Sequence, residues 1–231
     1  MWFQAMWFVT NQKSGGSALG LQRLLGLGSY QTAWTWLHKM RRAMVRPGRD
    51  RLTGAVEIDE TYVGGPEEGV SGRETLTKSI VVIAAEEAGR GIGRIRLHRL
   101  DDVSRDSLLP FVEDAVETGS QVHTDGWPGY MGLAARGYKH KVTNLSRTEM
   151  LAHELLPRVH RIAALLKRWI LGTHQGSVSD KHLDYYLDEY TFRFNRRLSR
   201  ARGLLFYRLV QQAAQITPTS YREIVAENGQ E

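Results

Sequence analysis

The order of the apolar segments in the middle of this chain constrains its fold more than any other feature. Three strand-like runs, a helix opened by a serine and a fourth short strand follow one another, at 55–65, 79–87, 93–100, 104–117 and 120–127. The first three strands can form a meander, and the helix can carry the chain back so that the fourth strand lies beside the first. This order predicts an α/β fold with a ribonuclease-H-like core.

Helical segments flank this core on both sides. Residues 1–48 predict two helices around a Gly-Leu-Gly-Ser turn, with Ser29 as the N-cap of the second. The arrangement fits a helix-turn-helix that contacts DNA and also a plain helical hairpin, and the sequence leaves both open. Two long helices at about 151–171 and 180–199, and a shorter one, follow the core. We therefore expect a helical DNA-binding-type segment at 1–48 and a ribonuclease-H-like domain at 49–231.

Charge and cysteine content narrow the classes of partner and site. The net charge is +6 and the pI is about 9.6, which favours an anionic partner such as nucleic acid. The chain has no cysteine, so disulfides and cysteine-based zinc sites are excluded. No apolar run approaches the roughly 20 residues that a membrane helix needs, so no membrane is expected among the partners.

Two acidic residues stand where this topology would bring them together. Asp59 lies inside the first strand, with Glu57 on the same face and Glu60 on the opposite face, because side chains alternate along a strand. Asp125 ends the fourth strand. Neighbouring carboxylates repel unless a proton or a cation bridges them, and their oxygens suit Mg²⁺ or Mn²⁺. The alternative is that Asp59 is a solvated edge residue and that Asp125 merely starts a turn.

The segment LPRVHRIAALLKRW, residues 156–169, predicts an amphipathic helix with two polar residues off its apolar stripe. The stripe is formed at helical spacing by Ile162, Leu165, Leu166, Trp169 and Ile170. His160 and Lys167 lie two turns apart on a face nearly opposite, with the small Ala163 and Ala164 between them. That face could offer an imidazole and an ammonium to a substrate, or it could be the solvated back of the helix.

Several motifs coincide with those of one protein family. VEIDETYVGG (56–65) resembles the first-Asp strand of DDE-type bacterial insertion-sequence transposases of the ISXO-like group, the insertion-sequence 1595 family. VHTDGWPGY resembles the second-Asp motif of that family, and LLKRWILGTHQGSVSDKHLDYYLDEYTFRFNRR is similar to its long C-terminal signature. The N-terminal ALGLQRLLGLGSYQTAWTWLHKMRRAM also resembles the segment before the catalytic domain. The resemblance covers about residues 2–210.

The resemblance implies which residues form the catalytic site. Asp59 and Asp125 match the first and second catalytic acids. The third position, usually Glu or Asn with a Lys or Arg seven residues on, falls on His160, followed by Lys167, and 34 residues separate it from Asp125. The chain therefore resembles a D-D-H-K variant, with Glu154 as the nearest carboxylate that could substitute for the histidine.

The family resemblance also sets the expected activity. It implies a DNA transposase that hydrolyses phosphodiester bonds at transposon ends and joins the freed 3′ ends to target DNA. Two divalent ions, Mg²⁺ or Mn²⁺, would be held by Asp59, Asp125 and His160, and Lys167 would contact a phosphate. An imidazole ligand favours Mn²⁺. The alternatives are a decayed or repurposed transposase that binds DNA without cutting it, and a ribonuclease-H-like nuclease acting on RNA–DNA hybrids.

The partner implied by the resemblance is double-stranded DNA, both transposon ends and target. We expect a homo-oligomer on that DNA and a cytoplasmic location at the bacterial nucleoid. The residues expected to contact DNA are Arg41, Arg42, Lys167, Arg168, Arg196 and Arg197. The family usually carries a cysteine zinc ribbon before the helical segment, so we expect either that this chain is truncated there or that this member lacks the ribbon.

Overall fold

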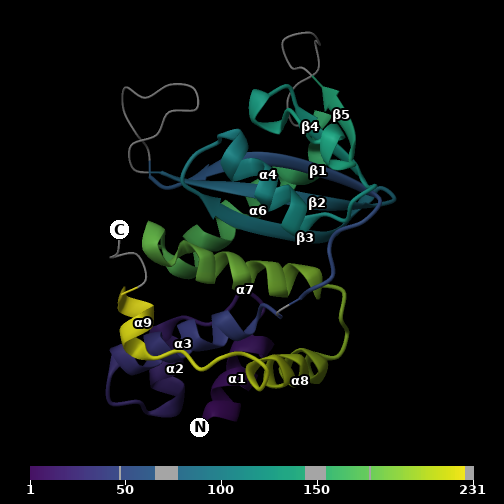
Figure 1. The fold of residues 1–231 in the computed structure, drawn as a ribbon. Helices are drawn as coiled ribbons and strands as arrows, with labels where there is room; N and C mark the ends of the chain where they lie inside the picture. The colour runs from purple at the N-terminus through teal and green to yellow at the C-terminus, as the bar shows by residue number, and fades with distance from the viewer. Residues whose placement is uncertain (47, 66–77, 144–154, 177, 227–231) are drawn as a thin grey trace. The chain divides into compact units, whose positions relative to one another are not determined.

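The chain divides into two compact units. The computed structural model describes residues 1–46, 48–65, 78–143, 155–176 and 178–226 (Figure 1). One unit combines residues 1–49 with 169–231, and the other comprises residues 50–168. The predicted division after residue 48 lies beside this boundary. The helices after residue 168 group with the N-terminal segment, whereas the sequence-based division placed them with the sheet.

The unit of residues 50–168 is built on a five-stranded sheet with the order β3-β2-β1-β4-β5 (Figure 1). The strands β1 to β5 are Ala55–Val63, Ser79–Ala88, Gly91–Leu100, Gln121–Asp125 and Lys139–Thr143. β2 is antiparallel to both β1 and β3, whereas β4 runs parallel to β1 and β5 parallel to β4. This is the strand order and direction of a ribonuclease-H-like fold, so the predicted fold class is confirmed. Because β1 is the central strand, Asp59 does not lie on an edge of the sheet.

The crossover from β3 to β4 is made by α4 (Arg105–Ala115), whose start is capped by the side chain of Ser104. Val56 and Ile58 of β1 pack in one hydrophobic cluster with Leu108 and its neighbours on α4. The apolar side chains of β1 thus point toward α4. Since side chains alternate along a strand, Glu57 and Asp59 point to the other face of the sheet. Two short 3₁₀ helices, η1 (Pro128–Tyr130) and η2 (Ala134–Arg136), lie between β4 and β5.

The first turn of α6 (Pro157–His174) contacts that other face, through Glu57 of β1. The buried side chains of α6 include Val159, Ile162, Ala163, Leu166 and Ile170. Leu165 and Trp169, which the sequence placed in the apolar stripe, are only half-buried. The buried face is therefore rotated from the predicted one toward His160. His160 and Lys167 flank this face and do not lie opposite it.

The unit formed by residues 1–49 and 169–231 is helical. Its helices are α1 (Trp2–Asn11), α2 (Ala18–Leu25), α3 (Tyr30–Ala43), α7 (Leu183–Asn195), α8 (Arg202–Ala213) and α9 (Tyr221–Ala226), with the 3₁₀ helix η4 (Asp180–His182) before α7. Gly26 ends α2 in the left-handed conformation at φ 62°, and Ser29 caps α3 by accepting from the N–H of Gln31 at 3.1 Å. The predicted helix-turn-helix-like pair is thus present as α2 and α3. No described helix is long and apolar enough to cross a membrane.

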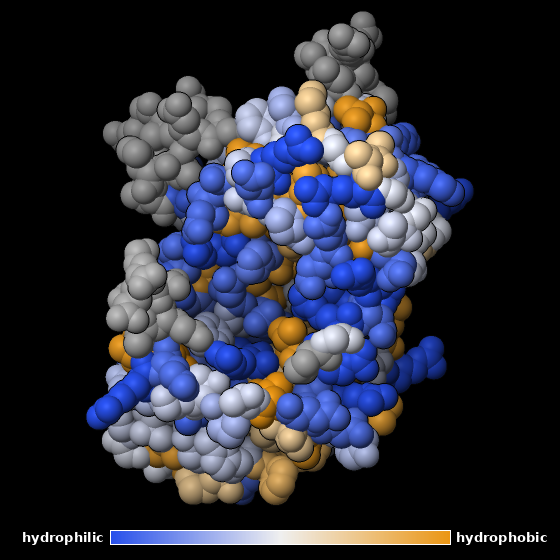
Figure 2. Space-filling view, in the orientation of Figure 1, coloured by the Kyte–Doolittle hydropathy of each residue, from blue (hydrophilic) through white to orange (hydrophobic). Residues whose placement is uncertain are grey.

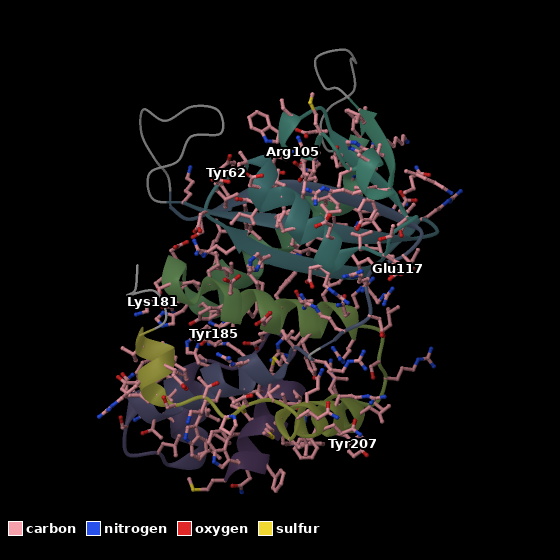
Figure 3. The ribbon with its side chains drawn as sticks, in the orientation of Figure 1. Tyr62, Arg105, Glu117, Lys181, Tyr185 and Tyr207 are labelled. Atoms are coloured by element: carbon pink, nitrogen blue, oxygen red, sulfur yellow. The ribbon has the colours of Figure 1, made fainter. Side chains whose placement is uncertain are left out.

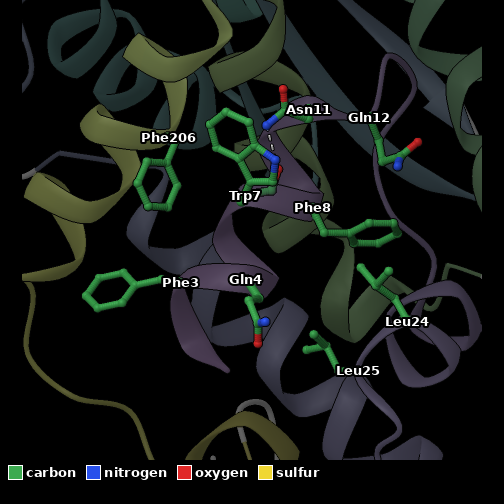
Figure 4. Close-up of a pocket in the computed structure, with 9 residues that line it drawn as sticks. All are labelled: Phe3, Gln4, Trp7, Phe8, Asn11, Gln12, Leu24, Leu25 and Phe206. Atoms are coloured by element: carbon green, nitrogen blue, oxygen red, sulfur yellow. Dashed lines mark hydrogen bonds between the residues drawn. The ribbon is translucent and has the colours of Figure 1, made fainter.

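The helical unit also has an apolar pocket of about 590 Å³ (Figure 4). It is lined by Phe3, Gln4, Trp7, Phe8, Asn11, Gln12, Leu24, Leu25 and Phe206, none of which is charged. Phe3 is 64 % exposed and Trp7 is 49 % exposed. Elsewhere hydrophilic side chains dominate the face shown in Figure 2.

A buried ion-pair network holds the helical unit together. Glu189 on α7 accepts from Arg41 of α3 at 2.8 Å and from Arg193, one turn on, at 2.7 Å. Arg193 also donates to the carbonyl oxygens of Val9 and Gln12 at the end of α1. Burial alone would raise the pKa of Glu189, but the charges of Arg193 and Arg41 outweigh it and lower this pKa to about 2. The carboxylate therefore stays ionised inside the unit.

Next to this network, His38 of α3 is fully buried with neither ring nitrogen hydrogen-bonded within the described part of the chain. Aromatic rings surround it, with centroid distances of 4.1 Å to Trp34, 4.9 Å to Tyr185, 5.2 Å to His182 and 5.6 Å to Tyr186. None of these neighbouring side chains is a carboxylate that could pair with a charged imidazole. The environment therefore favours the neutral form.

Burial, followed by the charges of Arg41, His182 and His174, lowers the pKa of His38 from 6.5 to about 2. In the unfolded chain this histidine binds a proton as the pH falls through about 6.5, whereas in the folded chain it stays neutral. As the pH falls, His38 therefore binds a proton in the unfolded chain before it does so in the folded chain. The stability associated with His38 is complete above about pH 6.5 and is lost progressively as the pH falls below it.

Replacing His38 by Phe, which keeps an aromatic ring in this site, should reduce the acid sensitivity of the helical unit. Linkage predicts that at about pH 5 the native protein loses roughly 2 kcal/mol of unfolding free energy through His38 alone. Urea titrations at about pH 7 and about pH 5 should show a smaller difference for His38→Phe than for the native protein. The exposed His98, changed to Phe, is the control. An equal acid-induced loss in the native protein and in His38→Phe would show that the buried imidazole is not responsible.

Candidate active site

Asp59 lies in the middle of the central strand, where its neighbours restrict its side chain. It pairs across β1 and β2 with Ile83, and its Oδ1 accepts from the backbone N–H of Glu60 at 2.9 Å. Its side chain is 14 % exposed. Figure 3 labels Tyr62, three residues further along, near the end of the sheet where β1 finishes. Asp59 is therefore a largely buried acid in the central strand, not a solvated edge residue.

His160 of α6 lies against this acid. Its Nε2 is 3.8 Å from Oδ2 of Asp59, and its side chain is 34 % exposed. His160 lies one residue past Val159, whose backbone N–H bonds to Glu57 of β1. The structure thus brings together two of the three residues that the sequence assigned to the metal site.

Asp125 reaches the same level of the sheet from the neighbouring strand. The last parallel pair of β1 and β4 is Glu57 with His123, and two residues further on each strand gives Asp59 and Asp125. Both therefore project to the same face of the sheet. Oδ1 of Asp125 accepts from the backbone N–H of Trp127 at 2.9 Å, which holds the carboxylate at the start of the following turn.

The turn after β4 is fixed by contacts with its surroundings. The indole N–H of Trp127 donates to the carbonyl oxygen of Val103 at 2.8 Å. A Cβ added to Gly129 would lie 2.7 Å from a methyl carbon of Leu108 and 2.8 Å from the Val103 oxygen, so only glycine fits there without displacing its neighbours. The Trp-Pro-Gly segment thus packs tightly on α4 and positions Asp125 from the C-terminal side.

Tyr130, at the end of this turn, connects the two acidic strands. It is fully buried, and its hydroxyl donates to the carboxylate of Glu60. Burial, followed by the negative charges of Glu60, Asp59 and Asp125, raises the pKa of Tyr130 well above its ordinary value. The hydroxyl therefore stays protonated, and it experiences the charge of both candidate acids.

Lys167 lies two turns after His160 on the exposed side of α6. Loss of solvation, followed by the positive charge of Lys78 just before β2, lowers the pKa of Lys167 below its ordinary value. Two ammonium groups that repel each other are relieved by an anion between or beside them. The sequence had not singled out Lys78, because it stands at the end of a polar loop with no recognisable pattern.

The donor set suits a divalent cation. An ion with bonds of about 2.1 Å to an oxygen and to a nitrogen can reach both atoms of the Asp59–His160 pair, which are 3.8 Å apart. Among the described residues, no group of three histidine, aspartate or glutamate side chains stands ready to hold a metal ion. Asp125 is thus on the correct face but does not form a closed cluster with the other two. The alternative acid Glu154 lies outside the described residues.

Comparison with known proteins identifies the family. A family model described as the ISXO2-like transposase domain matches residues 51–195. The chain belongs to this family. The match spans the whole described sheet, α6 and α7, and so includes Asp59, Asp125, His160 and Lys167.

Two solved structures resemble this member of the ISXO2-like transposase family. One is an intasome of simian T-cell lymphotropic virus in complex with PP2A regulatory subunit B56 gamma, with 13 % identity and a TM-score of 0.43, covering 96 % of this chain and 76 % of that chain. The other is the Mos1 strand transfer complex, with 10 % identity and a TM-score of 0.35, covering 99 % of this chain and 78 % of that chain. The search of curated proteins found no significant match.

The basic residues expected to bind DNA occupy different environments in this ISXO2-like transposase. Arg41 is 2 % exposed, pairs with Glu189 and stacks on the ring of Tyr186 at 4.0 Å, so its guanidinium is directed to the interior and not to a phosphate. Arg42 and Arg168 are exposed. The sequence could not separate Arg41 from Arg42, because the partner of Arg41 lies 148 residues away.

The last two candidate arginines follow α7 in the transposase. Arg196 is half-buried and its guanidinium lies 4.0 Å from the ring centroid of Phe192. Arg197 is exposed and lies 3.9 Å from the ring of Phe194. Stacking on a phenyl ring fixes the direction of each guanidinium, and one Nη of each also donates to the carbonyl oxygen of the residue on which it stacks.

Proposed function

We propose that this transposase-family chain cleaves duplex DNA at transposon ends and joins the freed 3′ ends to target DNA, with Asp59, Asp125 and His160 holding divalent cations. The observation that carries the proposal is the approach of His160 on α6 to Asp59 on the central strand, at 3.8 Å. A second support is the parallel register of β1 and β4, because Asp59 and Asp125 each stand two residues past the last pair, Glu57 and His123. Mg²⁺ and Mn²⁺ are the cations that this oxygen-rich set favours.

Each residue has a separate part in this proposal. Bound divalent cations would supply charge neutralisation at the scissile phosphate and a lowered pKa for the attacking group. Asp59 and Asp125 bring two negative charges to one face of the sheet, and His160 adds a neutral nitrogen donor. Lys167 contacts a phosphate near the cleaved end as a point charge, in concert with Lys78.

The DNA contacts of the proposal rest on exposed basic residues. Arg42, Lys167, Arg168 and Arg197 are exposed and remain proposed phosphate contacts, with the half-buried Arg196 as a further one. Arg41 is left out because it is buried. We further propose a homo-oligomer that holds two DNA ends, acting at the bacterial nucleoid in the cytoplasm.

The proposal is tested with a duplex that carries the inverted repeats flanking this reading frame, in Mg²⁺ and in Mn²⁺. The native chain should cleave faster in Mn²⁺, because an imidazole ligand suits Mn²⁺ better than Mg²⁺. His160→Ala should cleave at least about tenfold more slowly in Mn²⁺ and lose that preference. His98→Ala, the same exchange at an exposed site on β3, should behave like the native chain. Equal rates in the two metals, or normal cleavage by His160→Ala, would contradict the assignment of His160.

Two observations favour a second function, DNA binding without cleavage. No three-ligand group is preformed among the described residues, and a histidine stands where the family usually has an acid or amide. The same duplex decides between the two functions. Salt-sensitive binding with no cleavage in either metal would establish the second.

A further inference from the structure

Glu57 is a buried carboxylate on β1, two residues before Asp59 and on the same face of the sheet. Its Oε2 accepts from the backbone N–H groups of Arg158 at 2.7 Å and Val159 at 3.1 Å. These are the first two N–H donors of α6, because Pro157 has none. A residue about a hundred positions away in the sequence therefore caps this helix, and its negative charge also complements the helix dipole.

The side chain of Arg158 ties the same turn to a second part of the sheet. Its Nη1 donates to Oε1 of Glu57 at 2.6 Å and to Glu87 at 3.2 Å. Its Nε donates to the carbonyl oxygen of Gly91 at 3.1 Å, and its Nη2 to that of Gly89 at 2.9 Å. The first turn of α6 is thus bonded to β1 and to the connection between β2 and β3. Two attachment points restrict both sliding and rotation of the helix.

This attachment sets the position of His160 relative to Asp59. Glu57 and Asp59 are two residues apart on one strand face, about 7 Å along the strand. Their partners, Val159 and His160, are consecutive on α6. Sliding α6 by one residue would shift it about 1.5 Å and turn it about 100°, which would remove the imidazole from the carboxylate. The buried apolar side chains of α6, such as Ile162 and Leu166, resist the same rotation, and the bonds to Glu57 add fixed attachment points at the first turn.

We propose that Glu57 is a positioning residue, which fixes the register of α6 on β1 and thereby holds His160 against Asp59. This role rests on the proposed function of Asp59 and His160. Glu57 itself is satisfied by the N–H groups and the guanidinium described above, so it acts through the helix and not on substrate or metal.

The test compares Glu57→Ala with Glu57→Gln and with a matched control, Glu87→Gln. Glu87 contacts the same guanidinium, but the N–H groups of Arg158 and Val159 donate to Glu57 instead, and the side chain of Glu87 is 35 % exposed. The first readout is hydrogen exchange at the amides of Arg158 and Val159. The second is the Mn²⁺ concentration at half-maximal binding, followed by Mn²⁺ EPR, and the third is the cleavage rate.

Glu57→Ala should lose at least about tenfold of the amide protection in the first turn of α6. Its Mn²⁺ midpoint should rise, or its cleavage rate fall, by about 10- to 100-fold, the usual effect of removing a group that orients a metal ligand. Glu57→Gln keeps one oxygen that can accept from both N–H groups, so its loss of amide protection should be under about tenfold. Glu87→Gln should stay within about twofold of the native chain in all three readouts.

The outcomes separate this proposal from the proposed function. If Asp59→Asn is inactive while Glu57→Ala keeps native amide protection, Mn²⁺ midpoint and rate, the positioning role is wrong. If Asp59→Asn cleaves normally, the proposed function is wrong, and amide exchange still decides whether Glu57 caps α6. Should Glu57→Ala fail to fold, Glu57→Gln decides: a protected first turn with a Mn²⁺ midpoint raised less than about tenfold supports the role. An unprotected first turn with a native midpoint overturns it.

Discussion

Asp59→Asn and Asp125→Asn are each expected to lower the rate of metal-dependent DNA cleavage by about three orders of magnitude or more. An amide is neutral and binds a hard cation poorly, and a divalent ion contributes several kcal/mol of transition-state stabilisation. Asp59 is largely buried in the central strand and faces His160 at 3.8 Å, so its loss removes a carboxylate from the centre of the candidate site. The measurement is the single-turnover cleavage rate on a labelled transposon-end duplex.

The control for these variants is Asp101→Asn, the same exchange at an aspartate that is 84 % exposed and follows β3. It should cleave at the native rate. Binding of the duplex, measured in the absence of divalent ions, should be retained by all three variants because the phosphate contacts are made by basic residues. If Asp59→Asn or Asp125→Asn cleaved within about tenfold of the native rate, that acid would not be a metal ligand of the catalytic site.

Glu189→Ala is expected to destabilise the helical unit more than any other single exchange considered for it. The substitution leaves the guanidiniums of Arg41 and Arg193, 2 % and 12 % exposed, without their shared carboxylate. Removing one member of a buried ion pair typically costs about 3–5 kcal/mol, because a charge is left uncompensated in the interior. Urea unfolding followed by circular dichroism measures the loss.

Glu113→Ala is the matched control for Glu189→Ala. Glu113 pairs with Arg136, but the two side chains are 43 % and 38 % exposed, and such surface pairs contribute about 0–1 kcal/mol. If both exchanges lowered the unfolding free energy by the same small amount, the network around Glu189 would not be the stabilising centre that its contacts indicate.

The Glu189 network also shows what part of the family signature does. Tyr186, Glu189 and Arg193 belong to the long C-terminal motif by which the chain resembles its family. In the structure Tyr186 stacks under Arg41, and the other two form the buried ion pairs. These positions hold α3, α7 and the end of α1 together, so this part of the motif stabilises the helical unit.

The sequence predicted the sheet well because most strands have a clear pattern of apolar side chains. It missed β5, whose residues Lys139–Thr143 are mostly polar and at least partly exposed. Lysine on an edge strand guards against pairing with other chains, and it also removes the pattern by which a strand is recognised. The grouping of the C-terminal helices with the N-terminal segment was not predicted either, since amphipathicity shows that a face is buried but not against what.

The sequence pointed to some residues of the candidate site and not to others. The spacing of Asp59, Asp125 and His160 led to the prediction that they share a site; in the structure His160 lies 3.8 Å from Asp59, and the strand register puts Asp125 on the same face as Asp59. Glu57 was recognised as sharing a face with Asp59, but its partners on α6 are about a hundred residues away and leave no local signal. Long-range contacts of this kind need the fold before they can be read.

The most direct test of the central claim is pulsed EPR of Mn²⁺ bound to the chain together with a transposon-end duplex. If Asp59, Asp125 and His160 hold the ion, the native complex will show nitrogen coupling from a coordinated imidazole. That coupling will be absent in His160→Ala, and Asp59→Asn and Asp125→Asn will bind Mn²⁺ at least about tenfold more weakly. Nitrogen coupling that persists without His160, or Mn²⁺ binding that is unchanged in both aspartate variants, would contradict the account.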